Sequence, residues 1–70
     1  MAWTQNVNST MAQSVGWDDA TDEIIITWSN GRVSAYSGGT EDLADQCSRA
    51  ASVGDFINSE IKPSLSHRYV

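Results

Sequence analysis

Residues 23–36 constrain the fold of this chain most, and they read Glu-Ile-Ile-Ile-Thr-Trp-Ser-Asn-Gly-Arg-Val-Ser-Ala-Tyr. Isoleucine, threonine and tryptophan suit a pleated, half-buried surface, and the Asn30-Gly31 pair supplies the two positive-φ positions of a type I′ turn. The stretch therefore predicts a β-hairpin with a two-residue loop. In that register Trp28 lies opposite Val33, and Ile25 lies opposite Tyr36.

This register divides the hairpin side chains between the two faces of a sheet. The face that we expect to be buried carries Ile24, Ile26, Trp28, Val33 and Ala35. The other face carries Ile25, Thr27, Ser29, Arg32, Ser34 and Tyr36. Because this second face mixes an isoleucine and a tyrosine with polar groups, we expect any binding chemistry there.

A further strand is expected before the hairpin. Residues 10–17 alternate between two sides in the pattern of a half-buried strand. The polar connection 18–22 is too short for a crossover, so this strand is predicted to run antiparallel to residues 23–29.

Two short helices are expected after the hairpin. Thr40 can cap a helix whose first turn holds Glu41 and Asp42, and Ser52 can open a second helix that ends at Pro63. The order of elements predicts an α+β fold, a three-stranded antiparallel meander followed by two short helices packed on one face.

We expect residues 9–63 to form this domain, with residues 1–8 as an N-terminal extension and residues 64–70 as a C-terminal tail. A chain of 70 residues buries a thin core. The single Cys47 excludes an intrachain disulfide, and no Cys/His cluster suggests a metal, so self-association is the stabilising device that remains. We therefore expect a homo-oligomer, with Trp3 and Ile25 at its interface.

The net charge is −5, from nine acidic residues against four basic ones. This charge opposes general nucleic-acid binding, which depends on clustered lysine and arginine, but it permits a small anionic ligand. The chain has no basic and apolar leader and no apolar run of membrane-spanning length. We expect a cytoplasmic protein without a membrane partner.

Catalysis has little support in the sequence. A Cys47/His67 nucleophile pair can be written down, but Cys47 falls on the apolar stripe of the first helix, which favours a buried, inert thiol. His67 lies in the tail, where a solvated or packing role is favoured. The acidic residues of 18–23 lack the spacing of an EF-hand loop, which favours a solvated turn. We predict no enzyme, no metal and no cofactor.

Ligand binding is the stronger hypothesis. Arg32 and Tyr36 share one face, and an aromatic ring beside a guanidinium is a common platform for a nucleobase and its phosphate. The alternative is an ordinary surface pair or an oligomer contact. The opening of the second helix offers free backbone N–H groups for an anion, or simply a plain N-cap. The candidate ligand-binding residues are Arg32, Tyr36, Ser52, Gly54, Asn58, Lys62 and Arg68.

Several segments match a known pattern in order and spacing: Val7-Asn-Ser, Val15-Gly-Trp17, Ile24-Ile-Ile-Thr-Trp28 with Asn30-Gly31, Ala35-Tyr36-Ser-Gly, and residues 50–58 running into Ile61-Lys62. Over residues 7–68 the chain resembles the KTSC domain family, which is named for its occurrence at the C-terminus of some lysyl-tRNA synthetases. The family pattern has a central Tyr-x-Tyr, where this chain has Ser34-Ala35-Tyr36, and tends to have an aromatic residue where this chain has Pro63-Ser64.

The resemblance implies a bacterial or phage protein, since family members occur alone or as appended domains, and an RNA-binding role has been suggested for them. Small acidic phage proteins often bind a host factor or sequester a signal molecule. We therefore expect a non-enzymatic binding module that acts as a homo-oligomer. It would sequester a small phosphorylated, nucleotide-like ligand or inhibit a host defence protein. The alternative is an RNA-binding module.

Overall fold

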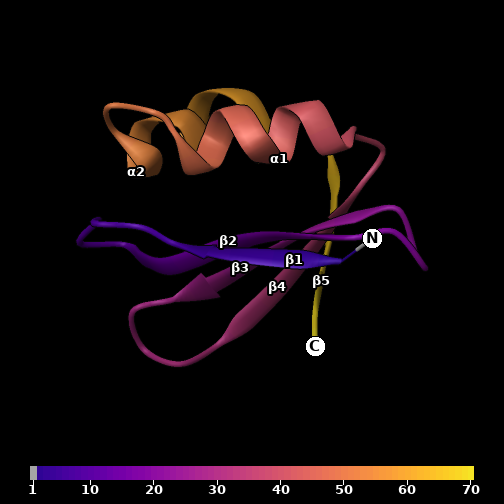
Figure 1. The fold of residues 1–70 in the computed structure, drawn as a ribbon, viewed down its shortest axis with the longest axis horizontal. Helices are drawn as coiled ribbons and strands as arrows, with labels where there is room; N and C mark the ends of the chain where they lie inside the picture. Colours follow the sequence, from indigo (N-terminus) through magenta and orange to yellow (C-terminus); the bar gives the residue numbers. More distant parts are fainter. Residues whose placement is uncertain (1) are drawn as a thin grey trace.

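The computed structural model describes residues 2–70 and has one antiparallel sheet in this range. The strands follow chain order in the sheet, and the helical segments cover one of its faces (Figure 1). The elements are β1 (Trp3–Asn6), β2 (Ala12–Asp18), β3 (Glu23–Trp28), β4 (Val33–Ser37), α1 (Glu41–Ser48), α2 (Val53–Phe56), the π-helical turn η1 (Ile57–Ile61) and β5 (Ser66–Tyr69). The predicted α+β class and antiparallel meander are confirmed, but the sheet has five strands rather than three.

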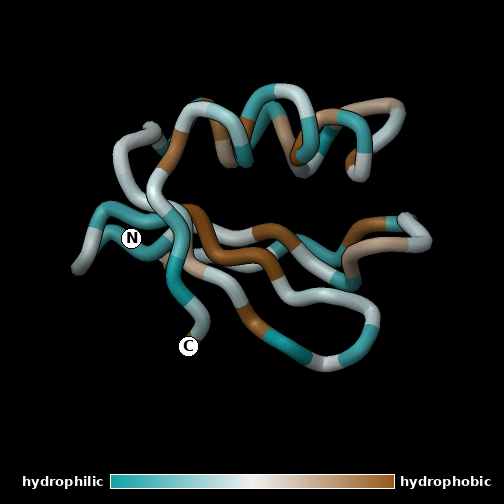
Figure 2. The backbone as a smooth tube through the Cα atoms, turned by 180° about the vertical axis from the view of Figure 1, so that it is seen from behind, coloured by the Kyte–Doolittle hydropathy of each residue, from teal (hydrophilic) through white to brown (hydrophobic). Residues whose placement is uncertain are grey.

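The core lies between the sheet and the helical layer, and Figure 2 shows the hydrophobic stretches of both layers. Ile24 and Ile26 of β3 and Ile57 and Ile61 of η1 have no solvent exposure. Cys47 of α1 is equally buried, as the apolar stripe of that helix predicts. Full burial of one isoleucine contributes about 1.5–3 kcal/mol, so these side chains hold the two layers together.

Both helices begin where the sequence predicts. The Thr40 hydroxyl accepts a hydrogen bond from the Leu43 N–H at 3.2 Å, and the Ser52 hydroxyl accepts one from the Asp55 N–H at 3.4 Å. The second helix continues from α2 into η1, where the Lys62 N–H donates to the Ile57 carbonyl at 2.8 Å. This π-type bond places Lys62 at the end of the helical layer, directly before Pro63.

The two segments that we expected to flank the domain are its edge strands. β1 pairs with β2, and β5 pairs with β4. Their short, polar sequences carry little apolar alternation, so the signal that reveals a half-buried strand is weak. Trp3 docks on its own chain, because its indole N–H donates to the Glu41 carboxylate at 2.8 Å. Met1, the first residue of the expected extension, lies outside the described residues.

The predicted hairpin register is wrong by one residue. Thr27, rather than Trp28, pairs with Val33, and the Gly31 N–H donates to the Trp28 carbonyl at 3.0 Å. The loop therefore has three residues, and Gly31 adopts a φ of 89°. This geometry is a type I turn followed by a glycine bulge, which an Asn-Gly sequence also suits.

The one-residue shift exchanges the faces of β4. Tyr36 pairs with Ile24 and Ser34 pairs with Ile26, so both side chains point toward the helical layer rather than away from it. Tyr36 is only 3% exposed. Val33 and Ala35, which we expected on the core face, lie on the opposite face of the sheet, where Ala35 is buried as expected and Val33 is half-buried.

The open face is mostly polar or small in character. Ile25 lies there as predicted and is half-buried. Arg68 of β5 reaches the buried Glu23 carboxylate with two hydrogen bonds of 2.9 and 2.8 Å. This ion pair ties β5 across β4 to β3 on the face opposite the helices. Within residues 2–70, no helix combines the length and apolar character needed to cross a membrane.

Candidate ligand-binding pocket

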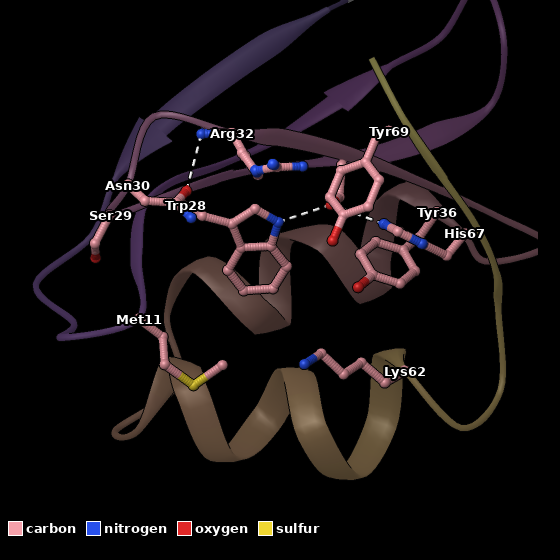
Figure 3. A pocket seen from close by; sticks show the side chains of 10 residues that line it. Met11, Trp28, Ser29, Asn30, Arg32, Tyr36, Lys62, His67 and Tyr69 are labelled. Carbon is pink, nitrogen blue, oxygen red and sulfur yellow. Dashed lines mark hydrogen bonds between the residues drawn. The ribbon is translucent and has the colours of Figure 1, made fainter.

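A pocket of about 580 Å³ opens where the hairpin, β5 and the end of the helical layer meet (Figure 3). Its volume is within the range of small-molecule sites. The pocket combines aromatic, basic and neutral polar side chains, and no carboxylate of residues 2–70 lines it. The lining residues are Met11, Trp28, Ser29, Asn30, Arg32, Ser34, Tyr36, Lys62, His67 and Tyr69.

The strand register explains how these side chains meet. Ser34 pairs with Tyr69, and Tyr36 pairs with His67, so four side chains of β4 and β5 project from the same face. Alternate residues of a strand share a face, and this face points toward the helical layer. Lys62 then approaches from the opposite side, at the end of η1 (Figure 3).

The two cations of the pocket lie over aromatic rings. The Arg32 guanidinium carbon is 5.4 Å from the centroid of the Tyr69 ring, and the Lys62 ammonium is 5.4 Å from that of Trp28. Both distances are within the range of cation–π attraction. The cations come from different layers of the fold, so together they frame the pocket.

These two cations also differ from the other basic side chains in their partners. Arg49 is paired with Asp45, and Arg68 is paired with Glu23. Among the described residues, neither Arg32 nor Lys62 forms an ion pair with a carboxylate. In a chain of net charge −5, the pocket is therefore a locally positive region.

A row of rings forms one wall of the pocket. The Tyr36 and His67 centroids are 5.0 Å apart, and the His67 and Tyr69 rings meet edge to face at 4.6 Å. Burial, with a smaller effect of Tyr69, raises the pKa of Tyr36, so this phenol stays neutral at physiological pH. Tyr69 is 61% exposed and forms the outer end of the row.

The structure brings together three of the predicted ligand-binding residues: Arg32, Tyr36 and Lys62. Arg68 does not join them, because β5 directs it to the open face, where Glu23 binds it. Asn58 lies outside this pocket and contacts the Met11 sulfur at 3.8 Å.

Ser52 and Gly54 line a separate pocket of about 270 Å³ between the Ser9 loop and the start of α2. Ser52 is the N-cap of α2. A Cβ at position 54 would come within 2.9 Å of the Met11 sulfur, so glycine permits close packing there. Capping and packing account for these two residues.

The candidate ligand-binding residues predicted from the sequence did not include four residues that line the pocket: Trp28, Ser34, His67 and Tyr69. We expected Trp28 in the core, but it is half-buried and its indole lines the pocket. The tail sequence contains one indication of this arrangement: His67 and Tyr69 are two residues apart, so they would share one face if the tail formed a strand.

Cys47 has the properties of an inert thiol. Burial raises its pKa to about 11, and it does not line the pocket. His67, the other member of the conceivable nucleophile pair, is instead bonded to Ser34 through Nε2 at 2.8 Å. Within residues 2–70 no three His, Cys, Asp or Glu side chains cluster closely enough to hold a metal ion.

Comparison with known proteins gives the family. The sequence profile of the KTSC domain matches residues 8–65, which is most of the chain. The chain belongs to the KTSC domain family. The resemblance noted from the hairpin and second helix is thereby confirmed. No curated protein matches this KTSC domain.

A solved structure supports the fold of this KTSC domain. The crystal structure of the KTSC domain protein YPO2434 from Yersinia pestis superposes with a TM-score of 0.87 at 24% sequence identity. The match covers 100% of this chain and 99% of the Yersinia protein. The five-stranded sheet with its helical layer is thus similar to an experimentally determined fold.

Proposed function

We propose that this KTSC domain is a non-enzymatic binding protein for a small phosphorylated molecule with an aromatic ring, of the nucleotide class. The proposal depends on one observation: two cations that form no ion pair with a carboxylate of residues 2–70 line the same pocket as several aromatic rings. Aromatic side chains stack on nucleobases, and guanidinium and ammonium groups bind phosphate.

Charge favours a small ligand over a long polymer. Binding to an RNA strand gains affinity by neutralising many phosphates. This chain has four basic side chains, and carboxylates already occupy Arg49 and Arg68. Arg32 and Lys62 suffice for one or two phosphate groups, which matches a mononucleotide or dinucleotide.

Single-stranded RNA is the second candidate, because the row of rings ends at the exposed Tyr69. A base stacked on Tyr69 could continue into a strand outside the pocket. The two candidates differ in their response to salt. RNA binding through several phosphates would weaken steeply with rising salt, whereas a mononucleotide held by two cations would show a shallow dependence.

Self-association is part of the proposal. β5 is an edge strand beside the pocket, and edge strands present unpaired backbone groups to other chains. Tyr69 and Val70 are each 61% exposed at this edge. A second copy that covered them would enclose the open end of the pocket, as sequestration of a ligand requires. A bound host protein would use the same exposed surface.

The test is native mass spectrometry of the protein purified without denaturation, followed by calorimetric titration with AMP, GMP, CMP and UMP. A bound mass of a few hundred daltons that disappears in an Arg32→Ala, Lys62→Ala double variant would support the proposal. Arg49→Ala, which removes a positive charge that is paired with Asp45 outside the pocket, serves as the control for each single variant and should retain the mass. Protein without bound mass that also binds none of the four nucleotides would contradict the proposal.

The corresponding nucleosides, which lack the phosphate, separate the contribution of phosphate binding from that of base stacking. Adenosine should bind more weakly than AMP by a factor on the order of 10 or more, because hydrogen bonds to charged groups contribute about 1.5–3 kcal/mol. Equal binding of AMP and adenosine would show that Arg32 and Lys62 do not hold the phosphate.

A further inference from the structure

A buried hydroxyl links two walls of the pocket. Ser34 has no solvent exposure and lies on β4, between β3 and β5. Its Oγ is 2.7 Å from the Trp28 indole nitrogen and 2.8 Å from Nε2 of His67. In Figure 3 dashed lines mark these hydrogen bonds at the nitrogen of the Trp28 indole and at the His67 imidazole.

The available protons decide which group donates in each of these bonds. An indole N–H can only donate, so Ser34 accepts from Trp28. A serine hydroxyl has a single proton, and His67 Nε2 is the other polar atom within hydrogen-bond distance among the described residues. The Ser34 hydroxyl proton can therefore form a hydrogen bond only if Nε2 of His67 accepts it.

The opposite arrangement would leave a buried donor without a partner. If Nε2 carried a hydrogen, Ser34 would accept twice and its own proton would point into a site with no solvent exposure. Buried polar groups in folded proteins are almost always paired, because an unpaired one loses its hydration without compensation.

We propose that Ser34 is a positioning residue that holds His67 in the neutral tautomer with its proton on Nδ1 and fixes the Trp28 ring against the same hydroxyl. The inference rests on the proposed function only in treating the cavity as a ligand pocket. Within residues 2–70, Nδ1 of His67 has no hydrogen-bond partner, so the tautomer leaves its N–H free to donate.

With this tautomer, the two cations and the histidine of the pocket have distinct roles in the proposed binding. The positive charge comes from Arg32 and Lys62, which lie over Tyr69 and Trp28. His67 contributes a neutral ring, packed against Tyr36 and Tyr69, and one N–H donor. A donor of this kind suits a carbonyl or ring nitrogen of a nucleobase, whereas the cations suit a phosphate.

The tautomer can be measured directly, because His67 is the one histidine of the chain. Long-range ¹H–¹⁵N correlation spectra of the uniformly labelled protein, recorded at alkaline pH where imidazoles are neutral, distinguish a protonated from an unprotonated ring nitrogen. We expect a protonated Nδ1 and an unprotonated Nε2. A protonated Nε2 in the wild-type protein would overturn the proposal, and this outcome requires no ligand.

Two variants test whether Ser34 is the cause. In Ser34→Ala we expect Nε2 to gain the proton, as in free neutral imidazole, and the indole N–H signal of Trp28 to move; Trp28→Phe identifies that signal. Ser37→Ala, on the same strand but on the open face, should change neither. An unchanged tautomer in folded Ser34→Ala would also overturn the proposal. If Ser34→Ala does not fold, the wild-type spectrum still decides.

Discussion

The ammonium of Lys62 lies 5.4 Å from the centroid of the Trp28 indole, and this contact connects the helical layer to the hairpin at the mouth of the pocket. An exposed cation–π pair of this kind contributes about 0.5–1 kcal/mol. Because Lys62 lines the same pocket as Arg32, we expect its role in the proposed binding to be larger than its role in stability.

Replacement of Lys62 by alanine should therefore separate binding from folding. We expect the affinity for the best-binding nucleotide of the AMP, GMP, CMP and UMP series to fall by a factor on the order of 10, while urea unfolding shows a change within about 1 kcal/mol. Calorimetry and denaturation monitored by fluorescence measure the two effects. Arg49→Ala is the matched control, because Arg49 is paired with Asp45 outside the pocket. Equal losses of affinity in both variants would indicate a general charge effect.

Tyr36 contributes to both the core and the pocket. We therefore expect its alanine and phenylalanine variants to differ in their free energy of unfolding. Tyr36→Ala removes a ring that is 3% exposed, which we expect to cost about 3–5 kcal/mol of unfolding free energy. Tyr36→Phe retains the ring and should change stability little, since the Tyr36 hydroxyl makes no hydrogen bond within residues 2–70. Chemical denaturation of both variants tests this, and a Tyr36→Ala protein as stable as the wild type would contradict the corrected register.

The Glu23–Arg68 pair should make stability depend on pH. The Arg68 guanidinium, helped by Thr21, lowers the pKa of Glu23 below its usual value. The folded state therefore favours the charged carboxylate. The contribution is complete above the ordinary glutamate pKa of about 4.3, and it disappears as the pH falls through the lowered pKa of the folded state.

Arg68→Gln should thus lower Tm at neutral pH and lose this effect in acid. Thermal unfolding followed by circular dichroism between about pH 7 and pH 2 would show the two Tm curves converging at the acidic end. Curves that remain equally separated throughout would mean that Arg68 stabilises the sheet without involving the Glu23 charge.

Gly16 should be essential for the attachment of β1. A Cβ at this position would lie 2.5 Å from the Trp3 carbonyl oxygen, and a backbone atom cannot easily move away. We expect Gly16→Ala to cost about 1–3 kcal/mol and to weaken the β1–β2 pairing first. Hydrogen exchange would show faster exchange of the amides that pair these strands. Gly31→Ala, at a position with open space and a positive φ, should leave β1 protected.

Cys47 should resist thiol reagents in the folded protein. Its burial and its pKa of about 11 leave almost no accessible thiolate at neutral pH. Reaction with a disulfide reagent such as DTNB should become fast only when urea unfolds the chain. Rapid labelling of the native protein would show that α1 opens readily from the sheet.

Local signals in the sequence predicted local structure well. Thr40 and Ser52 cap the helices because an N-cap depends on a hydroxyl and the N–H groups that follow it. The pairing of β1 and β5 depends on backbone groups far apart in the chain, and their short polar sequences give little periodic signal. An Asn-Gly pair suits both a two-residue and a three-residue hairpin loop. Asn30-Gly31 therefore predicted the position of the turn but not the length of its loop.

The structure brings some of the predicted site residues together, but on the face of the sheet opposite to the one that we expected. Arg32 and Tyr36 do line one pocket, but on the helix side of the sheet, together with Trp28. Lys62 joins them from η1. Arg68 was grouped with them by charge, yet the alternation of β5 directs its side chain to the opposite face, so that His67 and Tyr69 enter the pocket instead.

The three-residue hairpin loop has a consequence for how this chain can change in length. A slip of the Thr27–Val33 pairing by one residue would turn Ser34 and Tyr36 outward and bring Val33 and Ala35 to the helix side. A residue added to the loop or removed from it therefore preserves the pocket wherever the loop absorbs the change and the Thr27–Val33 pair is kept.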